Sequence, residues 1–239
     1  MGTNTRFLTT IKKGGAGKDK DRKLSIILLN AAPGYCMKSY GPKCLLKIND
    51  NVSVIEAQIE ILKRCYPNSE IISTIGFEAE KVVKRGVKNV RYVENQLFES
   101  THTVEEIKLA LNNCETDDVM IIYGDVVFNQ QAVDNITKDG STLVCVNNHN
   151  LDEDGIGVTM NNDNASILSY GINPKWSYIV YFCGKELNSL RRISMDKEKA
   201  KLYPFELINL ILEKGSNKIK VFTPSNGKIM KIESIKDVR

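Results

Sequence analysis

Residues 24–48 read LSIILLNAAPGYCMKSYGPKCLLKI, and this stretch decides the fold. Its apolar run, residues 24–29, predicts a buried strand. The run ends in a turn of small residues, 30–34, and the backbone N–H groups of such a turn can cradle phosphates. Lys43 follows a proline and can place a positive charge against the same phosphates. The stretch therefore predicts a nucleotide site at the end of the first strand.

The rest of the first half alternates short apolar runs with helical patterns. This alternation predicts a parallel sheet with helices on both faces. Ligands bind to such sheets at the carboxyl ends of the strands, where residues 30–34, Gly76 and the pair Gly124–Asp125 are expected. The predicted strands are 24–30, 70–75, 89–93 and 118–123, and the predicted helices are 52–65, 77–85, 103–113 and 129–136.

The pattern changes after residue 140, where shorter apolar runs are separated by polar turns. We expect a small antiparallel portion that extends the sheet and forms a wall of an acceptor pocket. Residues 24–140 would then form the nucleotide-binding half, and residues 141–239 the acceptor-binding half. The predicted strands are 143–146, 157–160, 166–170, 178–182 and 219–223, and the predicted helices are 184–191 and 203–214.

Composition fits one domain that follows a basic tail. The chain has 239 residues and a net charge of +4. Residues 1–23 hold seven basic and two acidic side chains, so the rest of the chain carries a net charge of −1. We interpret this tail, rich in Gly, Thr and Lys, as disordered and solvated rather than as a nucleic-acid-binding arm. Its GGAGK segment is no phosphate loop, because no strand precedes it and Asp19 stands where Ser or Thr is needed.

The six cysteines and the apolar runs indicate a cytoplasmic protein without a membrane span. The cysteines are scattered with no C-x-x-C pair, which is typical of reduced, packed thiols. No apolar run reaches the length of a membrane span, and no signal-peptide pattern precedes the first strand.

Residues 29–46 resemble the signature of the sugar-nucleotide-type nucleotidyltransferases, L-A-A-G-x-G-x-R-M, a spacer and P-K-x-L-L. The matching residues are Leu29, Ala31, Gly34, Met37, Pro42, Lys43, Leu45 and Leu46. Asn30, Ala32 and Cys36 depart from the pattern. Cys36 stands in place of an arginine that contacts the nucleotide phosphates in the family, and a thiol cannot supply a guanidinium fork.

Further stretches extend the resemblance over about residues 24–238. VMIIYGDVVF, residues 119–128, is similar to the family's LLLYGDVVF, and KIESIKD, residues 231–237, resembles E-I-D-T-x-E-D. Weaker matches are found at 71–77, 90–95 and 98–103. The resemblance implies a Rossmann-like mixed sheet of the glycosyltransferase-A type. The short chain and the YGD motif favour the small cytidylyltransferase branch, such as the phosphocholine cytidylyltransferases.

The resemblance also implies a reaction and the residues that perform it. An acceptor phosphate attacks the α-phosphorus of a nucleoside triphosphate, so catalysis consists of alignment and charge neutralisation. Asp125 and Glu233 would be the ligands of Mg²⁺, which prefers hard oxygen atoms. Lys43 would stabilise the phosphate charge in the transition state. The structural alternative for Asp125 is a cap of the following helix.

The other predicted contacts lie on turns or in an aromatic cluster. Tyr170, Trp176 and Tyr178 suit an acceptor with a quaternary ammonium, or else pack in the core, and Lys175 would hold the acceptor phosphate. The predicted nucleotide-binding residues are Asn30, Ala31, Ala32, Gly34, Lys38, Thr74, Gly76, Asn95 and Thr101.

We therefore expect a Mg²⁺-dependent nucleotidyltransferase that uses CTP and a small phosphorylated acceptor. A glycosyltransferase of related fold is one alternative, although such enzymes usually carry a D-x-D turn and this chain reads Asp125-Val126-Val127. A catalytically weakened nucleotide-binding protein is the other, favoured by Ala32, Cys36 and Glu233. The sequence leaves the acceptor, the base and the oligomeric state open.

Overall fold

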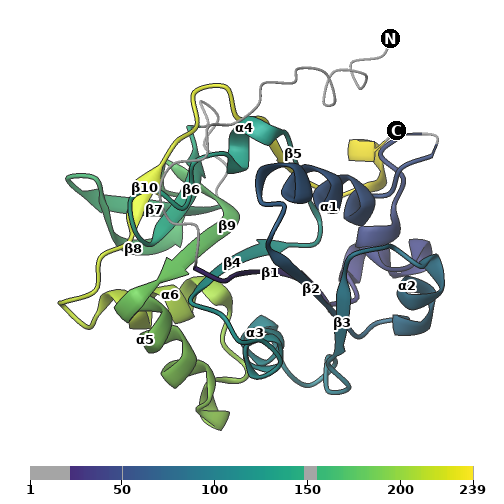
Figure 1. Ribbon diagram of the computed structural model, residues 1–239, viewed down its shortest axis with the longest axis horizontal. Helices are drawn as coiled ribbons and strands as arrows, with labels where there is room; N and C mark the ends of the chain where they lie inside the picture. Colours follow the sequence, from purple (N-terminus) through teal and green to yellow (C-terminus); the bar gives the residue numbers. More distant parts are fainter. Residues whose placement is uncertain (1–21, 50, 148–154, 239) are drawn as a thin grey trace.

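The computed structural model describes residues 22–49, 51–147 and 155–238. The interval 1–21 of the predicted basic tail lies outside these residues. Within the described part of the chain, one mixed sheet has nine strands in the order β3-β2-β1-β4-β9-β6-β10-β8-β7 (Figure 1). No helix in that part is both long enough and apolar enough to cross a bilayer.

The first half of the sheet is parallel, as predicted. β1 (Leu24–Asn30) lies between β2 (Glu70–Ile75) and β4 (Asp118–Tyr123), and β3 (Arg91–Glu94) flanks β2. Residues 26–28 of β1 are 0% exposed, which explains why they are all apolar. The carboxyl ends of β1, β2 and β4 consequently meet at one edge of the sheet.

The predicted antiparallel extension is confirmed. β9 runs antiparallel to β4 and β6, and β7 runs antiparallel to β8. This half of the sheet consists of β6 (Thr142–Val146), β7 (Ile156–Asn161), β8 (Asn164–Tyr170), β9 (Lys175–Cys183) and β10 (Lys220–Phe222).

Helices cover both faces of the sheet, as the alternation predicted. Along β1, Ile27 and Leu29 belong to one core cluster and Ile26 and Leu28 to the other, because successive side chains of a strand point to opposite faces. In Figure 1, α1 and α4 lie on one side, and α3, α5 and α6 on the other. The helices are α1 (Val54–Cys65), α2 (Ala79–Arg85), α3 (Thr103–Asn112), α4 (Gln130–Val133), α5 (Gly184–Ser194) and α6 (Pro204–Leu212), with 3₁₀ turns at Tyr35–Tyr40, Lys43–Leu45, Lys197–Lys199 and Ile235–Val238.

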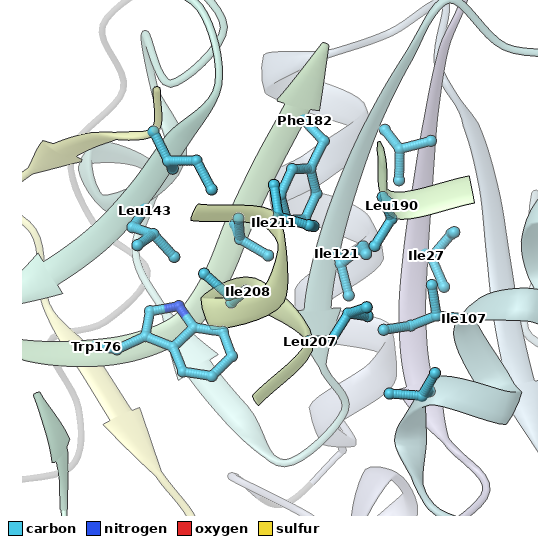
Figure 2. Packing of buried hydrophobic residues seen from close by; sticks show 14 of the residues in the cluster. Ile27, Ile107, Ile121, Leu143, Trp176, Phe182, Leu190, Leu207, Ile208 and Ile211 are labelled. Carbon is cyan, nitrogen blue, oxygen red and sulfur yellow. The ribbon is translucent and has the colours of Figure 1, made fainter. Parts of the chain in front are cut away.

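The cluster on the side of α3, α5 and α6 is the larger of the two and joins the halves of the molecule. Figure 2 shows Ile107 of α3 beside Ile27 and Ile121, and Ile208 of α6 near Trp176. Parallel and antiparallel strands thus share one core, and the two predicted halves pack as one continuous α/β unit.

Two short strands were missed by the sequence interpretation. β5 (Val126–Phe128) and β11 (Ile229–Lys231) pair antiparallel in a separate two-stranded sheet. Just beyond β11, Ile232 N–H donates to the Asp125 carbonyl at 2.8 Å. The C-terminal stretch is therefore anchored beside the end of β4. The helix predicted over 129–136 is also wrong in extent, because Asp134 leaves the helical conformation with φ −67° and ψ 134°.

Candidate active site

The turn after β1 is tied to both neighbouring strands. The Asn30 side-chain amide donates to Ser73 Oγ at 2.9 Å, and its backbone N–H donates to Thr74 Oγ1 at 3.2 Å. On the other side, Gly124 N–H donates to the Leu29 carbonyl at 2.9 Å. These bonds fix the three strand ends around a cavity of about 140 Å³.

Ten residues from five segments of the chain form most of the cavity lining. Five of them were predicted from the sequence and five were not. The predicted ones are Asn30, Ala32, Gly34, Lys43 and Asp125, and the others are Cys44, Thr103, Glu106, Tyr123 and Lys231.

Lys43 and Asp125, the two predicted catalytic residues, meet in this cavity. Lys43 Nζ lies 3.0 Å from Asp125 Oδ2 and donates to the Ile232 carbonyl at 2.9 Å. The lysine stem passes directly under Gly34, where an added Cβ would lie 2.8 Å from Lys43 Cε and φ is +56°. Glycine is needed at this position for both reasons. The ammonium is thereby held beside the turn that follows β1.

The donor atoms at Asp125 fit a magnesium ion. Asp125 Oδ1 is buried and has no hydrogen-bond partner among the described residues, and a buried carboxylate oxygen normally has one. No cluster of three His, Cys, Asp or Glu side chains that can hold a metal occurs in the described part of the chain. Asp125 thus offers a single carboxylate, and Mg²⁺ commonly takes one or two carboxylates together with substrate phosphate oxygens.

Glu233, the predicted second ligand, is not among the residues that line the cavity. Its side chain is 72% exposed, and Glu233 Oε1 is 3.9 Å from Lys231 Nζ. Its own N–H donates to Asp237 Oδ2 at 2.9 Å. Burial would raise the pKa of Asp237, but hydrogen bonds from Ser234 and Glu233 lower it on balance. Asp237 therefore anchors the turn that carries Glu233.

Glu106 was missed by the sequence interpretation and changes the reading of two predicted residues. This side chain of α3 is 3% exposed, and its Oε2 accepts from Thr74 Oγ1 at 2.6 Å and from Ala31 N–H at 3.1 Å. Burial raises the pKa of Glu106, although these two bonds oppose the shift. In this structure Ala31 and Thr74 hold Glu106 rather than facing the cavity with free polar groups. An acid in the first turn of a helix is ordinary, so the sequence gave no reason to select it.

Lys231 was also missed, since the strand β11 that carries it was not recognised. Its Nζ lies 4.3 Å from the centre of the Tyr178 ring. Burial lowers the pKa of Lys231, but Tyr178 and Asp125 raise it on balance. The cavity consequently contains a second positive charge besides Lys43.

Two of the four predicted acceptor residues, Trp176 and Tyr178, pack together with ring centres 5.1 Å apart. Trp176 is 3% exposed, and its indole N–H donates to the Ile179 carbonyl at 3.0 Å, so it is a core residue. Tyr170 is 57% exposed and packs edge-on against Phe205, with ring centres 5.5 Å apart. Lys175 is buried beside Gly155. Trp176 and Tyr178 both pack against Tyr123 of the cavity lining, with ring centres 6.0 Å and 5.0 Å apart, and Tyr178 also contacts Lys231.

The remaining predicted contacts mostly shape the turns. Gly76 packs against Ala31, where an added Cβ would lie 2.9 Å from the carbonyl oxygen. Asn95 donates to Thr101 Oγ1 at 3.1 Å, and these two side chains close their own loop. The side chain of Lys38 lies outside the described residues.

The fold is similar to that of several solved nucleotidyltransferases. The CTP:phosphocholine cytidylyltransferase from Streptococcus pneumoniae is 19% identical to this chain, with 90% of this chain and 96% of that one covered and a TM-score of 0.73. The inositol-1-phosphate CTP transferase from T. maritima is 18% identical, with 90% and 91% covered and a TM-score of 0.68.

A third similar structure is the nucleoside-diphosphate-sugar pyrophosphorylase from Vibrio cholerae RC9, 12% identical, with 89% and 97% covered and a TM-score of 0.65. No protein-family model matches the chain, and no curated protein matches it significantly in sequence. At these identities the likeness shows the fold, which agrees with the resemblance seen in the sequence motifs.

Proposed function

We propose that this protein is a nucleotidyltransferase that moves a nucleotidyl group, cytidylyl from CTP, to a small phosphorylated acceptor. The observation that carries the proposal is the meeting of Lys43 and Asp125, 3.0 Å apart, in the cavity at the carboxyl ends of β1 and β4. CTP is favoured because two of the similar structures are named for CTP-dependent transfer. The proposed cofactor is Mg²⁺.

The proposed reaction needs little from the protein beyond alignment and charge. A phosphate oxygen of the acceptor forms a bond to the α-phosphorus of the triphosphate. The bond between that phosphorus and the bridging oxygen of the β-phosphate breaks, and its electron pair leaves with pyrophosphate. Because the attacking oxygen is already an anion, no general base is required. Fixed positive charge at such a transition state accelerates comparable reactions by about 10²–10³-fold.

Lys43 supplies this charge in the proposed mechanism. Its ammonium already lies beside the turn that follows β1, held by Asp125 and the Ile232 carbonyl. On triphosphate binding it would exchange these partners for phosphate oxygens. Asp125, aided by Glu233, would hold Mg²⁺, which when bound neutralises phosphate charge. The orphaned Asp125 Oδ1 supports this assignment.

A catalytically weakened nucleotide-binding protein is the second candidate. It is favoured by Cys36 in place of the family arginine, and by the Glu106 carboxyl group that occupies Ala31 N–H at 3.1 Å. A metal-dependent glycosyltransferase is less well supported, because Val127, two residues after Asp125, is buried and apolar.

Pyrophosphate release tests the proposal directly. The wild type would be assayed with Mg²⁺, each of the four common nucleoside triphosphates and a panel of phosphorylated acceptors. Asp125→Ala should abolish release, whereas Asp163→Ala, at an exposed turn between β7 and β8, should not. Release with CTP and one acceptor supports the proposal, and release with another triphosphate overturns the choice of base.

A parallel thermal-shift series separates the two candidates if no pyrophosphate is released. A triphosphate present at about 100 times its dissociation constant should stabilise the fold by roughly 2.7 kcal/mol. Metal-dependent stabilisation without release favours the nucleotide-binding protein. Neither stabilisation nor release would overturn both candidates.

A further inference from the structure

We propose that Lys231 selects the acceptor, excluding phosphorylated quaternary amines and admitting a phosphorylated polyol or sugar that carries no positive charge. The inference rests on the proposed nucleotidyl transfer and deepens it by naming the class of acceptor. It departs from the expectation that aromatic rings in the second half of the chain form a cage for a cation.

The first argument is the position of the Lys231 ammonium. Lys231 and Tyr123 line the cavity, and Tyr178 packs against both of them. The Lys231 Nζ atom lies 4.3 Å from the centre of the Tyr178 ring, within the range of about 6 Å over which an aromatic face binds a cation. The protein's own lysine thus occupies the ring face that a ligand ammonium would need.

The second argument is that the other rings of the predicted cage are not among the residues that line the cavity. Trp176 packs against Tyr178 with ring centres 5.1 Å apart, but it is closed off from a ligand. Trp176 is buried and its indole N–H is bound to a backbone carbonyl. Tyr170 is on the surface, where its ring packs against Phe205. Neither ring can replace Tyr178 as a platform in the cavity.

The third argument is charge. A quaternary ammonium placed on this ring face would lie close to the Lys231 ammonium, and two like charges repel strongly in a partly enclosed site. A lysine side chain is ordinarily charged at neutral pH. The ammonium group has three hydrogen-bond donors, which suit the hydroxyls and the phosphate of a polyol or sugar phosphate.

The family pattern E-I-D begins with glutamate, and this chain has Lys231 at that position.

Calorimetric titration tests the inference without requiring turnover. The probes are phosphocholine and inositol 1-phosphate, titrated into the full chain in the presence of Mg²⁺ and a non-hydrolysable CTP analogue. The wild type should bind inositol 1-phosphate about tenfold more tightly than phosphocholine or better, the size of effect expected for a like-charge clash. Lys231→Met, which keeps the length but removes the charge, should reduce this ratio by roughly fivefold or more. Lys236→Met, at an exposed lysine on the same C-terminal stretch, should leave it unchanged.

Lys231→Arg is the control for an effect of the substitution on folding. It keeps the charge and should keep the preference, whatever the effect of methionine on stability. Equal binding of the two probes by the wild type, an unchanged ratio in Lys231→Met, or binding of neither probe would overturn the inference. The predicted preference in calorimetry, without pyrophosphate release from any acceptor, would reject the proposed reaction and leave the role of Lys231 standing.

Discussion

Replacing Gly124 with alanine tests how tightly the end of β4 is locked to the turn after β1. An added Cβ would lie 1.5 Å from Asn30 Oδ1 and 2.8 Å from the Leu29 carbonyl oxygen. The Asn30 amide would have to rotate away, which breaks its 2.9 Å bond to Ser73 Oγ in a site where both residues are buried.

The expected cost has two parts. A buried polar group that loses its partner costs about 1–3 kcal/mol, and overpacking a close-packed site costs about 1–3 kcal/mol more. The free energy of unfolding should therefore fall by about 2–6 kcal/mol. For a chain of this size each kcal/mol lowers the Tm by about 2–4 °C.

Urea denaturation followed by circular dichroism measures this cost. Gly215→Ala is the matched control, because a Cβ there meets nothing within 4 Å, and it should change stability by less than about 0.5 kcal/mol. In the double variant with Asn30→Ala the clash with the amide is gone, so its cost should be at least about 1 kcal/mol below the sum of the single variants. A loss below about 1 kcal/mol in Gly124→Ala, or strict additivity, would refute the reasoning.

Three further predictions concern ionisable groups. Lys43→Met should lower kcat for pyrophosphate release by about 10²–10³-fold, measured at saturating triphosphate. Glu106→Gln should become more stable relative to wild type as pH rises above about 4.5, because the raised pKa of Glu106 makes the folded carboxyl costly to ionise; denaturation at pH 5 and 8 checks this. Burial would raise the pKa of Glu56, but Arg85 and Ser53 lower it to about 2, so wild type should lose stability between pH 4.5 and 2. Glu56→Gln should lose less stability, as measured by denaturation at pH 5 and again at a pH near 2.

The fold was largely predictable because its first half obeys strong local rules. The run at residues 24–30 was interpreted as a buried strand, and β1 has the same bounds. β5 and β11 were not predictable in the same way. Each has three residues, too few to show a period of two, and their pairing joins segments about a hundred residues apart. Such pairing depends on tertiary contacts that local patterns do not record.

The site was predictable where a motif carried it and not elsewhere. Lys43 and Asp125 follow distinctive turns, and the structure brings them together. Glu106 and Lys231 follow no such turn, so their place in the cavity depends on how α3 and β11 pack. The prediction that Tyr170 and Trp176 share a binding site was not supported, because residues near each other in the sequence of β-strands need not be near in space. Successive side chains of a strand face opposite sides of the sheet, and bulges shift the register.

The charges of the cavity indicate how binding energy can be used in the proposed reaction. Lys43 is paired with Asp125, and Lys231 lies on an aromatic ring and near Glu233. A phosphate that binds Lys43 must displace Asp125 from it, so the net gain from ground-state binding at Lys43 is small. As negative charge shifts toward the leaving pyrophosphate in the transition state, Lys43 gains more than it gave up to Asp125. Only an interaction that is stronger in the transition state accelerates the chemical step, so the Lys43–Asp125 pair directs the lysine charge toward catalysis rather than toward tight substrate binding.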